Sequence, residues 1–358
     1  MTFGLRVWLV AMFGWMLWVT RLLWTARAEP PLLPAFDSPL VHFDYFGEAL
    51  FAAFAACVVW PRVGMAAYVV VAAAALTADQ TRMQPQIFSF ALLMLGTWAN
   101  PTAKLLARTH LSSLWFFSGV HKLFSPDYYT QVAPWLWKGI VPAGDQPPFA
   151  SLAAGFGAAL ALIEVGLGIG LWFPRLRKSV AWVALAMHLG IVATLNHLDG
   201  WNTSVWGWNF AIGVAALVLI GRWREPLRIE VARSSRWVGA AAALLFTSPV
   251  LFYFGALDAY LCHCLYSANV ASADYLEADS KQSYKLNWIG GSVNVPLPPA
   301  HRLFEAYFRA VAKPGDRLFV RDPRWWAKSS LNDYYQWRCD AAGIHRENLA
   351  IASGKQAE

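Results

Sequence analysis

Long apolar runs without charge are the feature that most constrains what this chain can fold into. Val69–Leu76 and Phe210–Ile220 carry no charged residue, and several runs reach the ~20 residues that an α-helix needs to cross a bilayer. Charged residues make up only 14% of the chain, whereas soluble domains have about 25%. Tryptophan, which prefers the bilayer interface, stands at the ends of several runs, for example Trp60, Trp98 and Trp201. We therefore expect an all-α polytopic membrane protein whose first partner is the lipid bilayer.

The hydropathy pattern predicts about nine transmembrane helices. They fall at about residues 4–24, 41–60, 63–78, 84–99, 104–124, 149–173, 178–198, 204–221 and 236–256. The transmembrane helical domain is thus expected over residues 1–257, with a C-terminal region at 258–358. Ala26-Arg27-Ala28 resembles a signal-peptide cleavage site, but Arg21 interrupts the end of a long apolar run, so we favour a retained first helix.

Basic residues favour one side of the predicted bundle. Positive charge in short loops marks the cytoplasmic side of a membrane protein. The connections after even-numbered spans contain Arg62, Lys104, Arg108, Arg175, Arg177, Lys178, Arg222, Arg224, Arg228, Arg233 and Arg236. The connections after odd-numbered spans are poorer in basic residues and contain Glu29, Asp37, Asp79, Asp127, Asp145 and Asp199. We therefore expect a plasma- or inner-membrane protein with a cytoplasmic N-terminus and an extracytoplasmic C-terminal region.

The C-terminal region has the pattern of a small α+β unit. His301–Ala312 has a helical pattern, Arg317–Arg321 alternates between apolar and polar residues, and Lys313-Pro314-Gly315-Asp316 forms a turn signal between them. Cys262, Cys264 and Cys339 lie in this region, on the side expected to be oxidising. A disulfide from Cys339 to Cys262 or Cys264 and free thiols are both open. The spacing in Cys262-His263-Cys264 is shorter than in structural zinc sites, so no metal site is predicted.

A first layer of polar residues is expected near the outer surface. Ser118 and Lys122 are four residues apart, so on a helix they share a face with Trp115. Other residues at a similar expected depth are His42, Asp44, Glu48, Asp79, Arg82, Asn196, His197 and Asp199. These residues are either helix ends that meet lipid headgroups or the lining of a polar pocket. In the second case Trp115, Ser118, Asp79 and Arg82 are candidate ligand-binding residues.

A second layer lies deeper in the predicted membrane. Glu164 falls in the middle of one span and His188 near the middle of the next. Because a short loop joins these spans, they are antiparallel neighbours, and we expect a contact between Glu164 and His188. A charged group in hydrocarbon costs about 2.5–3.5 kcal/mol on insertion scales and usually has a partner. The pair is either a packing contact or a ligand and proton-relay contact.

The segment Phe117-Ser118-Gly119-Val120-His121-Lys122-Leu123 resembles the Gly-Val-x-Lys-Leu stretch of the vitamin K-dependent gamma-carboxylase. It is equally similar to the wider horizontally transferred transmembrane domain (HTTM) family, with Met187-His188-Leu189-Gly190-Ile191 resembling a later helix of that family. The resemblance covers about residues 40–220. It implies that Lys122 is a catalytic base on a reduced quinone, with His121 beside it, at a site facing the lumenal or outer side. It also implies a lipid-soluble reactant, through lyase or carboxylase chemistry or quinone-linked oxidoreductase chemistry.

The sequence departs from the carboxylase in two respects. His121 stands where the carboxylase motif has a second basic residue, and the large lumenal domain of the carboxylase has no counterpart. DoxX-like membrane proteins also end a helix with Gly-x-x-Lys-Leu, which leaves a non-catalytic subunit with a redox or assembly partner as the alternative. A transporter built on Glu164 and His188 is a second alternative. Nucleic acid is not expected as a partner, because the basic residues are concentrated in loops that would touch anionic lipid.

Overall fold

The structure, a computed structural model, describes residues 2–142, 144, 146, 149–221, 227–279, 282–286, 293–324, 327 and 333–349. Asp145, Arg222 and Arg224 of the predicted charge pattern lie outside the described residues, as do residues 350–358 of the predicted C-terminal region.

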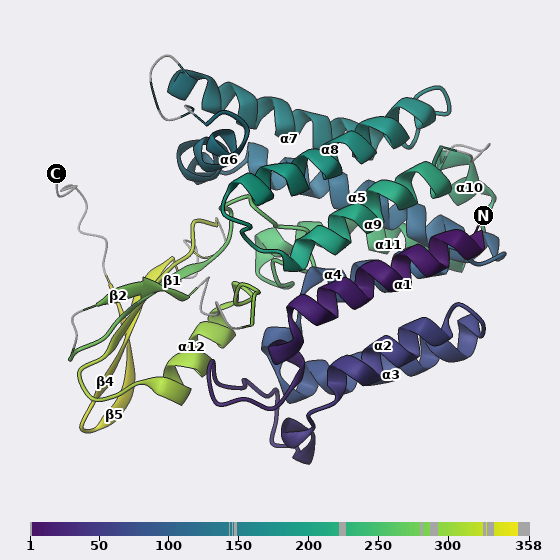
Figure 1. Cartoon of the computed structure of the whole chain (residues 1–358). Helices are drawn as coiled ribbons and strands as arrows, with labels where there is room; N and C mark the ends of the chain where they lie inside the picture. Colours follow the sequence, from purple (N-terminus) through teal and green to yellow (C-terminus); the bar gives the residue numbers. More distant parts are fainter. Residues whose placement is uncertain are drawn as a thin grey trace.

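Helices dominate the N-terminal two thirds of the described chain. They are α1 (Thr2–Val19), α2 (Phe46–Ala56), α3 (Pro61–Ala78), α4 (Pro85–Gly96), α5 (Pro101–Leu123), α6 (Ala133–Ile140), α7 (Ala153–Gly170), α8 (Arg177–His197), α9 (Ser204–Leu219), α10 (Leu227–Arg233) and α11 (Arg236–Thr247). Short 3₁₀ segments include η3 (Gln80–Arg82), η5 (Phe149–Leu152) and η6 (Ser248–Phe254). Figure 1 shows the long helices lying roughly side by side along one direction.

Five helical segments in the described residues are long and apolar enough to cross a membrane. They are Thr2–Val19, Pro61–Ala78, Phe149–Gly170, Arg177–His197 and Arg236–Phe254. The apolar helices α2, α4 and α9 are shorter, and α5 is long but more polar. Helix length and composition therefore support a membrane protein, whereas the count of nine spans stays a prediction.

Several helix starts follow directly from the sequence. Proline stands at the first position of α3, α4 and α5, where its missing N–H costs no intrahelical hydrogen bond. Asn100 caps α5, because its side-chain oxygen accepts hydrogen bonds from the backbone N–H groups of Thr102 and Ala103. These signals place the N-terminal end of α5, and hence the register of every polar side chain along that helix.

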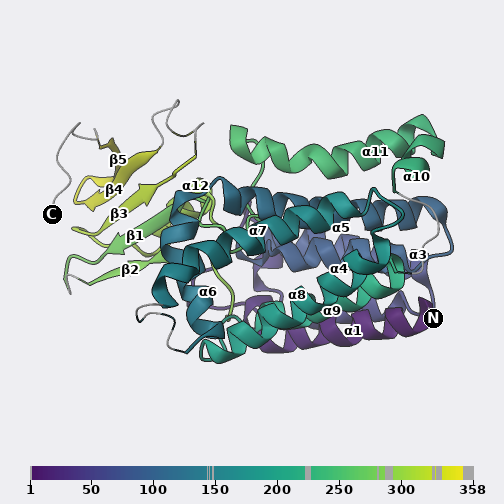
Figure 2. The same cartoon turned by 90° about the horizontal axis from the view of Figure 1, so that it is seen from above.

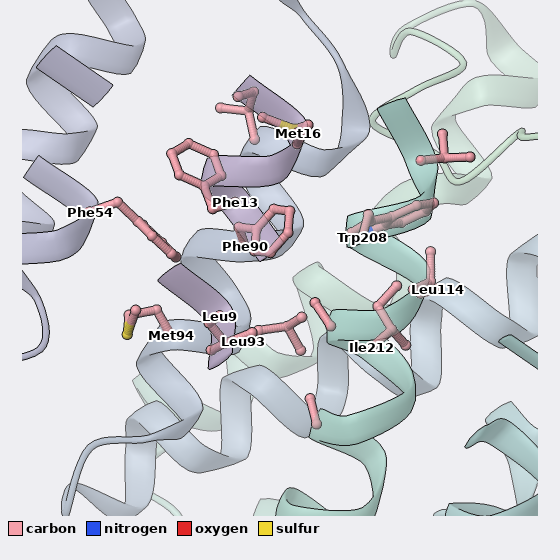
Figure 3. Packing of buried hydrophobic residues seen from close by; sticks show 14 of the residues in the cluster. Leu9, Phe13, Met16, Phe54, Phe90, Leu93, Met94, Leu114, Trp208 and Ile212 are labelled. Carbon is pink, nitrogen blue, oxygen red and sulfur yellow. The ribbon is translucent and has the colours of Figure 1, made fainter. Parts of the chain in front are cut away.

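The bundle core is held by interlocking aromatic rings. The Phe13 ring centroid lies 4.6 Å from that of Phe54, 5.2 Å from that of Phe90 and 5.6 Å from that of Tyr68. Figure 3 shows Phe13, Phe54 and Phe90 converging from different helices. Lipid tails are as apolar as these side chains, so tight packing, more than removal from water, holds such helices together.

A five-stranded antiparallel sheet forms the C-terminal end of the described chain. Its strands are β1 (Ser272–Leu276), β2 (Ser283–Lys285), β3 (Arg317–Arg321), β4 (Tyr334–Asp340) and β5 (Gly343–Asn348), in the order β2-β1-β3-β4-β5. Helix α12 (His301–Val311) buries Leu303, Phe304 and Phe308 in the same core as the inward residues of the sheet. The predicted helix at 301–312 and strand at 317–321 are both present. The sheet lies at the opposite end of the molecule from the N-terminus and α10 (Figures 1 and 2).

Of the two alternatives that the sequence left open for the cysteines, the structure has free thiols and no disulfide. All four cysteines are free and buried. Cys339 packs in the core of the sheet, whereas Cys262 and Cys264 pack in a separate small cluster with Phe252 and Tyr260. The sequence placed three cysteines on one side of the membrane but did not reveal that they belong to different cores. Burial raises the pKa of the Cys262 thiol to about 12, which keeps it protonated.

Candidate functional site

Lys122 lies in the last turn of α5 and forms a buried ion pair with Glu164 of α7. Its Nζ lies 2.7 Å from Glu164 Oε2 and 3.0 Å from Oε1, and it donates to Ser118 Oγ at 2.8 Å. Lys122 is 3% exposed and Glu164 5% exposed, so neither group relies on water. The predicted shared face of Ser118 and Lys122 is present, and Glu164 is the partner that the sequence did not indicate.

Two glycines bring α5 and α7 close enough for this pair. A Cβ on Gly119 of α5 would lie 2.5 Å from the carbonyl oxygen of Ala161. A Cβ on Gly168 of α7 would lie 2.6 Å from Phe116 Cβ and 2.7 Å from the carbonyl oxygen of Ser112. At the same crossing the Ser112 hydroxyl donates a hydrogen bond to the carbonyl oxygen of Gly168 at 2.7 Å. Small residues at such crossings let helix backbones approach one another in membranes. The glycines after Glu164 thus act partly as predicted, through close helix approach.

His188 does not contact Glu164 as predicted. The Trp115 indole N–H donates to His188 Nε2 at 3.0 Å, and His188 Nδ1 lies 2.7 Å from Asn209 Oδ1. Since the amide oxygen only accepts, the ring proton belongs on Nδ1. Trp115 is therefore shared: it lies on the same face of α5 as Ser118 and Lys122, but its N–H points to α8. Glu164 and His188 are turned toward different neighbours, Glu164 toward α5 and His188 toward α9 as well as α5.

His121 follows Lys122 in sequence but lies on another side of α5. Its Nδ1 accepts a hydrogen bond from the Tyr253 hydroxyl at 2.7 Å, and its Nε2 donates to the carbonyl oxygen of Cys262 at 2.8 Å. Both ring nitrogens are therefore used in holding η6 and the following segment against α5. The structure does not bring the His121 ring into the cluster of Lys122, Ser118 and Glu164.

Asp79 and Arg82 form a second, separate cluster at the junction of α3 and α4. Asp79 Oδ2 lies 2.7 Å from Arg27 Nη2 and accepts from Thr81 Oγ1 at 2.6 Å. Arg82 donates to the carbonyl oxygen of Leu23 at 2.8 Å, and its guanidinium lies 4.7 Å from the Phe46 ring centroid. Burial lowers the pKa of Arg82 to about 10, although Asp79 opposes this shift. This cluster ties the segment after α1 to the α3–α4 turn.

Two other residues of the outer polar layer form hydrogen bonds with backbone groups. Asp44 accepts a hydrogen bond from the backbone N–H of Ala26 at 2.8 Å. The His197 ring bonds to the carbonyl oxygen of Gly139 at 3.1 Å. The outer polar layer is thus divided in the structure into separate polar contacts. Buried opposite charges occur in two of them, the Lys122–Glu164 pair and the cluster of Asp79 with Arg27 and Arg82.

The Lys122–Glu164 pair can exchange a proton without creating a net charge. A lone ion in an apolar interior is very costly, whereas an ion pair with additional hydrogen bonds is tolerated. Transfer of one proton from the ammonium to the carboxylate gives a neutral amine and a neutral acid, and the sum of charges stays zero. The geometry therefore allows Lys122 to act as a base while Glu164 holds its proton.

Sequence reasoning missed the residues that complete these contacts. Asn209 lies in an apolar run as Trp208-Asn209-Phe210, and a polar amide at that depth was a signal that was available. Arg27 and Tyr253 lie far along the chain from their partners Asp79 and His121, so no spacing rule connects them. Arg108, which was assigned to a basic loop, is buried and pairs with Glu230 of α10. No protein-family model, curated protein or solved structure matches the chain.

Proposed function

We propose that the protein is an integral-membrane enzyme of HTTM or gamma-carboxylase type, in which Lys122 acts as a base on a lipid-soluble reactant of the quinone or lipid class. The observation that carries this proposal is the buried Lys122–Glu164 pair with Ser118. A lysine, a carboxylate and a hydroxyl within hydrogen-bond distance, in an apolar bundle, are the groups that proton abstraction requires.

The proposed step begins with proton transfer from Lys122 to Glu164. The resulting amine takes a proton from a hydroxyl of the reactant, for example a reduced quinone, and leaves an oxyanion beside the new ammonium. Glu164 then holds the displaced proton until it is returned, so every proton is accounted for within the site. Ser118 orients the lysine Nζ through its 2.8 Å hydrogen bond.

The proposal includes nine transmembrane helices and an extracytoplasmic C-terminal sheet. Figure 1 supports the placement of the sheet opposite the cytoplasmic end, because the N-terminus, the α7–α8 connection and α10 gather at one end and the sheet lies at the other. The basic residues Arg175, Arg177 and Lys178 belong to that N-terminal end. Lys122, at the C-terminal end of α5, then lies nearer to the outer side.

The test is ionisation of a reduced naphthoquinone by the full chain in lipid nanodiscs without oxygen. We expect the wild-type protein to generate the hydroquinone anion, seen by its absorbance, at a lower pH than empty nanodiscs do. The double variant Lys122→Met/Glu164→Gln leaves no unpaired buried charge and should lose this effect, whereas Lys178→Met, which removes an exposed lysine, should retain it. Equal anion formation by the wild type and the double variant excludes Lys122 as the base.

A DoxX-like subunit without catalytic activity is the second candidate, and one observation favours it. The three protons of the Lys122 ammonium are matched by Ser118 Oγ and the two carboxylate oxygens of Glu164, as in a structural clamp. In that case a stable partner protein should co-purify with the chain. The double variant should change how much of this partner is retained and should have no effect on hydroquinone anion formation.

A further inference from the structure

A cavity of about 280 Å³ lies between α4, α5, α9, α11 and the segment after η6. Its walls include Phe88, Leu92, Leu245 and Leu261, and among the described residues that line it there is no Asp, Glu, Lys or Arg. An apolar cavity with a few convergent polar groups is the usual form of a small-molecule site. The missing charges indicate that its occupant is neutral.

Three of the polar side chains that line this cavity come from separate parts of the chain. Ser89 Oγ of α4 lies 2.8 Å from His110 Nε2 of α5, and the His110 and His263 ring centroids are 5.5 Å apart. His263 is 9% exposed and lines the cavity beside His110. Burial, with His110 and His121 nearby, lowers the pKa of His263, so its ring is neutral.

Trp208 of α9, which is labelled in Figure 3, also lines the cavity, and its indole N–H is a hydrogen-bond donor. Its indole N–H is buried and, among the described residues, has no partner. A buried donor left without an acceptor normally costs about as much as a lost hydrogen bond, so each such group needs an explanation. A ligand oxygen is an acceptor that would satisfy it.

We propose that this cavity binds a neutral, ring-sized molecule carrying a hydroxyl or carbonyl oxygen, of the phenol or quinone class, through Ser89, His110, His263 and Trp208. The apolar walls accept the ring, and the imidazoles and the indole N–H are the polar groups available to its oxygen atoms. Ser89 is a binding group and not a nucleophile, because it lies inside α4, where the following backbone N–H groups are used within the helix and none is left to stabilise an oxyanion.

This site is separate from the proposed base. Lys122 lies twelve residues beyond His110 on α5, which is about 18 Å along a helix. The inference therefore does not rest on the proposed function. Either can fail alone: removal of Lys122 is expected to leave binding at this cavity unchanged.

The experiment measures binding of 1-naphthol, a fluorescent neutral phenol, to the full chain in nanodiscs. We expect saturable binding beyond that of empty nanodiscs, and at least tenfold weaker binding of naphthalene, which has the same rings without the oxygen. Ser89→Ala and Trp208→Phe should each weaken 1-naphthol binding severalfold. His263→Asn should do the same, and asparagine tolerates the left-handed backbone (φ +64°) that His263 adopts.

Matched controls separate loss of binding from loss of folding. Ser113→Ala removes a buried hydroxyl of the same helix bundle that bonds to the carbonyl oxygen of Phe246, and Trp206→Phe removes an indole N–H two residues from Trp208 that does not line this cavity. Both controls should bind like the wild type, as should Lys122→Met/Glu164→Gln. The proposal is overturned if naphthalene binds as tightly as 1-naphthol, if no saturable binding occurs, or if the three cavity variants bind like their controls.

Discussion

Lys122 and Glu164 are 42 positions apart in the sequence, and each makes the burial of the other possible. A single buried charge without its partner costs several kcal/mol, but a matched pair of apolar side chains of similar volume is often as stable as the ion pair. The energetic role of this pair is therefore better measured by removing both residues than by removing one.

Loss of one partner should destabilise the protein far more than loss of both. We expect Lys122→Met to lower the free energy of unfolding by about 3–5 kcal/mol, because it leaves Glu164 buried beside an apolar side chain. Lys122→Met/Glu164→Leu should recover most of that loss. Thermal unfolding followed by circular dichroism in one detergent gives the comparison. If the double variant is as unstable as the sum of the two single variants, the pair does not act as a coupled unit.

The sequence predicted which residues at this depth need partners but not which partners they take. Glu164 and His188 are on adjacent antiparallel helices, and their depth was the only information available. Contact also depends on how each helix is rotated about its axis. Gly168 lies on the face of α7 that meets α5, and Glu164, one turn earlier, shares that face. That rotation is set by packing with helices that are distant in sequence.

At the scale of the helix, the predicted spans each contain a helix of the structure, but several are shorter than expected. The second was expected at 41–60, whereas α2 begins at Phe46, because Pro39–His42 forms a separate 3₁₀ turn capped by Ser38. Hydropathy alone cannot separate an apolar turn from an apolar helix, since both lack charge. The helix at 301–311 was predictable because its pattern is strongly amphipathic.

Of the neighbouring glycines Gly166 and Gly168 of α7, only Gly168 lies in close contact with α5. Gly168→Ala should destabilise the protein by about 1–3 kcal/mol, because its Cβ would lie 2.7 Å from the Phe116 backbone nitrogen and from the Ser112 carbonyl oxygen. Gly166→Ala, on the same helix, has no atom within 4 Å of its added Cβ and should be neutral or slightly stabilising. Thermal unfolding of the two variants is the measurement. Equal effects would show that helix propensity, and not close packing, decides the outcome.

At the scale of the whole molecule, charge and architecture agree with each other. The sequence predicted that the basic connections lie on one side, and the α2–α3 and α7–α8 connections share one end of the bundle with the N-terminus (Figure 1). Arg108 differs from the other basic residues of these connections, because it is buried and forms an ion pair with Glu230. A basic residue that is counted in predicting membrane orientation can thus also belong to a structural ion pair. The number of positive charges in a loop does not reveal such a pair.

The orientation of this assembly gives the last prediction. With the N-terminal end cytoplasmic, an odd number of crossings carries the sheet, and the outer end of α5, to the opposite compartment. A green fluorescent protein fused after the last residue should be dark, whereas alkaline phosphatase at the same position should be active. The same reporters inserted after Arg175, in the full chain, should give the reverse result and serve as the internal control, because that connection is basic and lies at the N-terminal end. A fluorescent C-terminal fusion would require an even number of crossings. The sheet and the N-terminus lie at opposite ends of the bundle. A fluorescent C-terminal fusion would therefore also mean that the long axis of the bundle does not cross the bilayer.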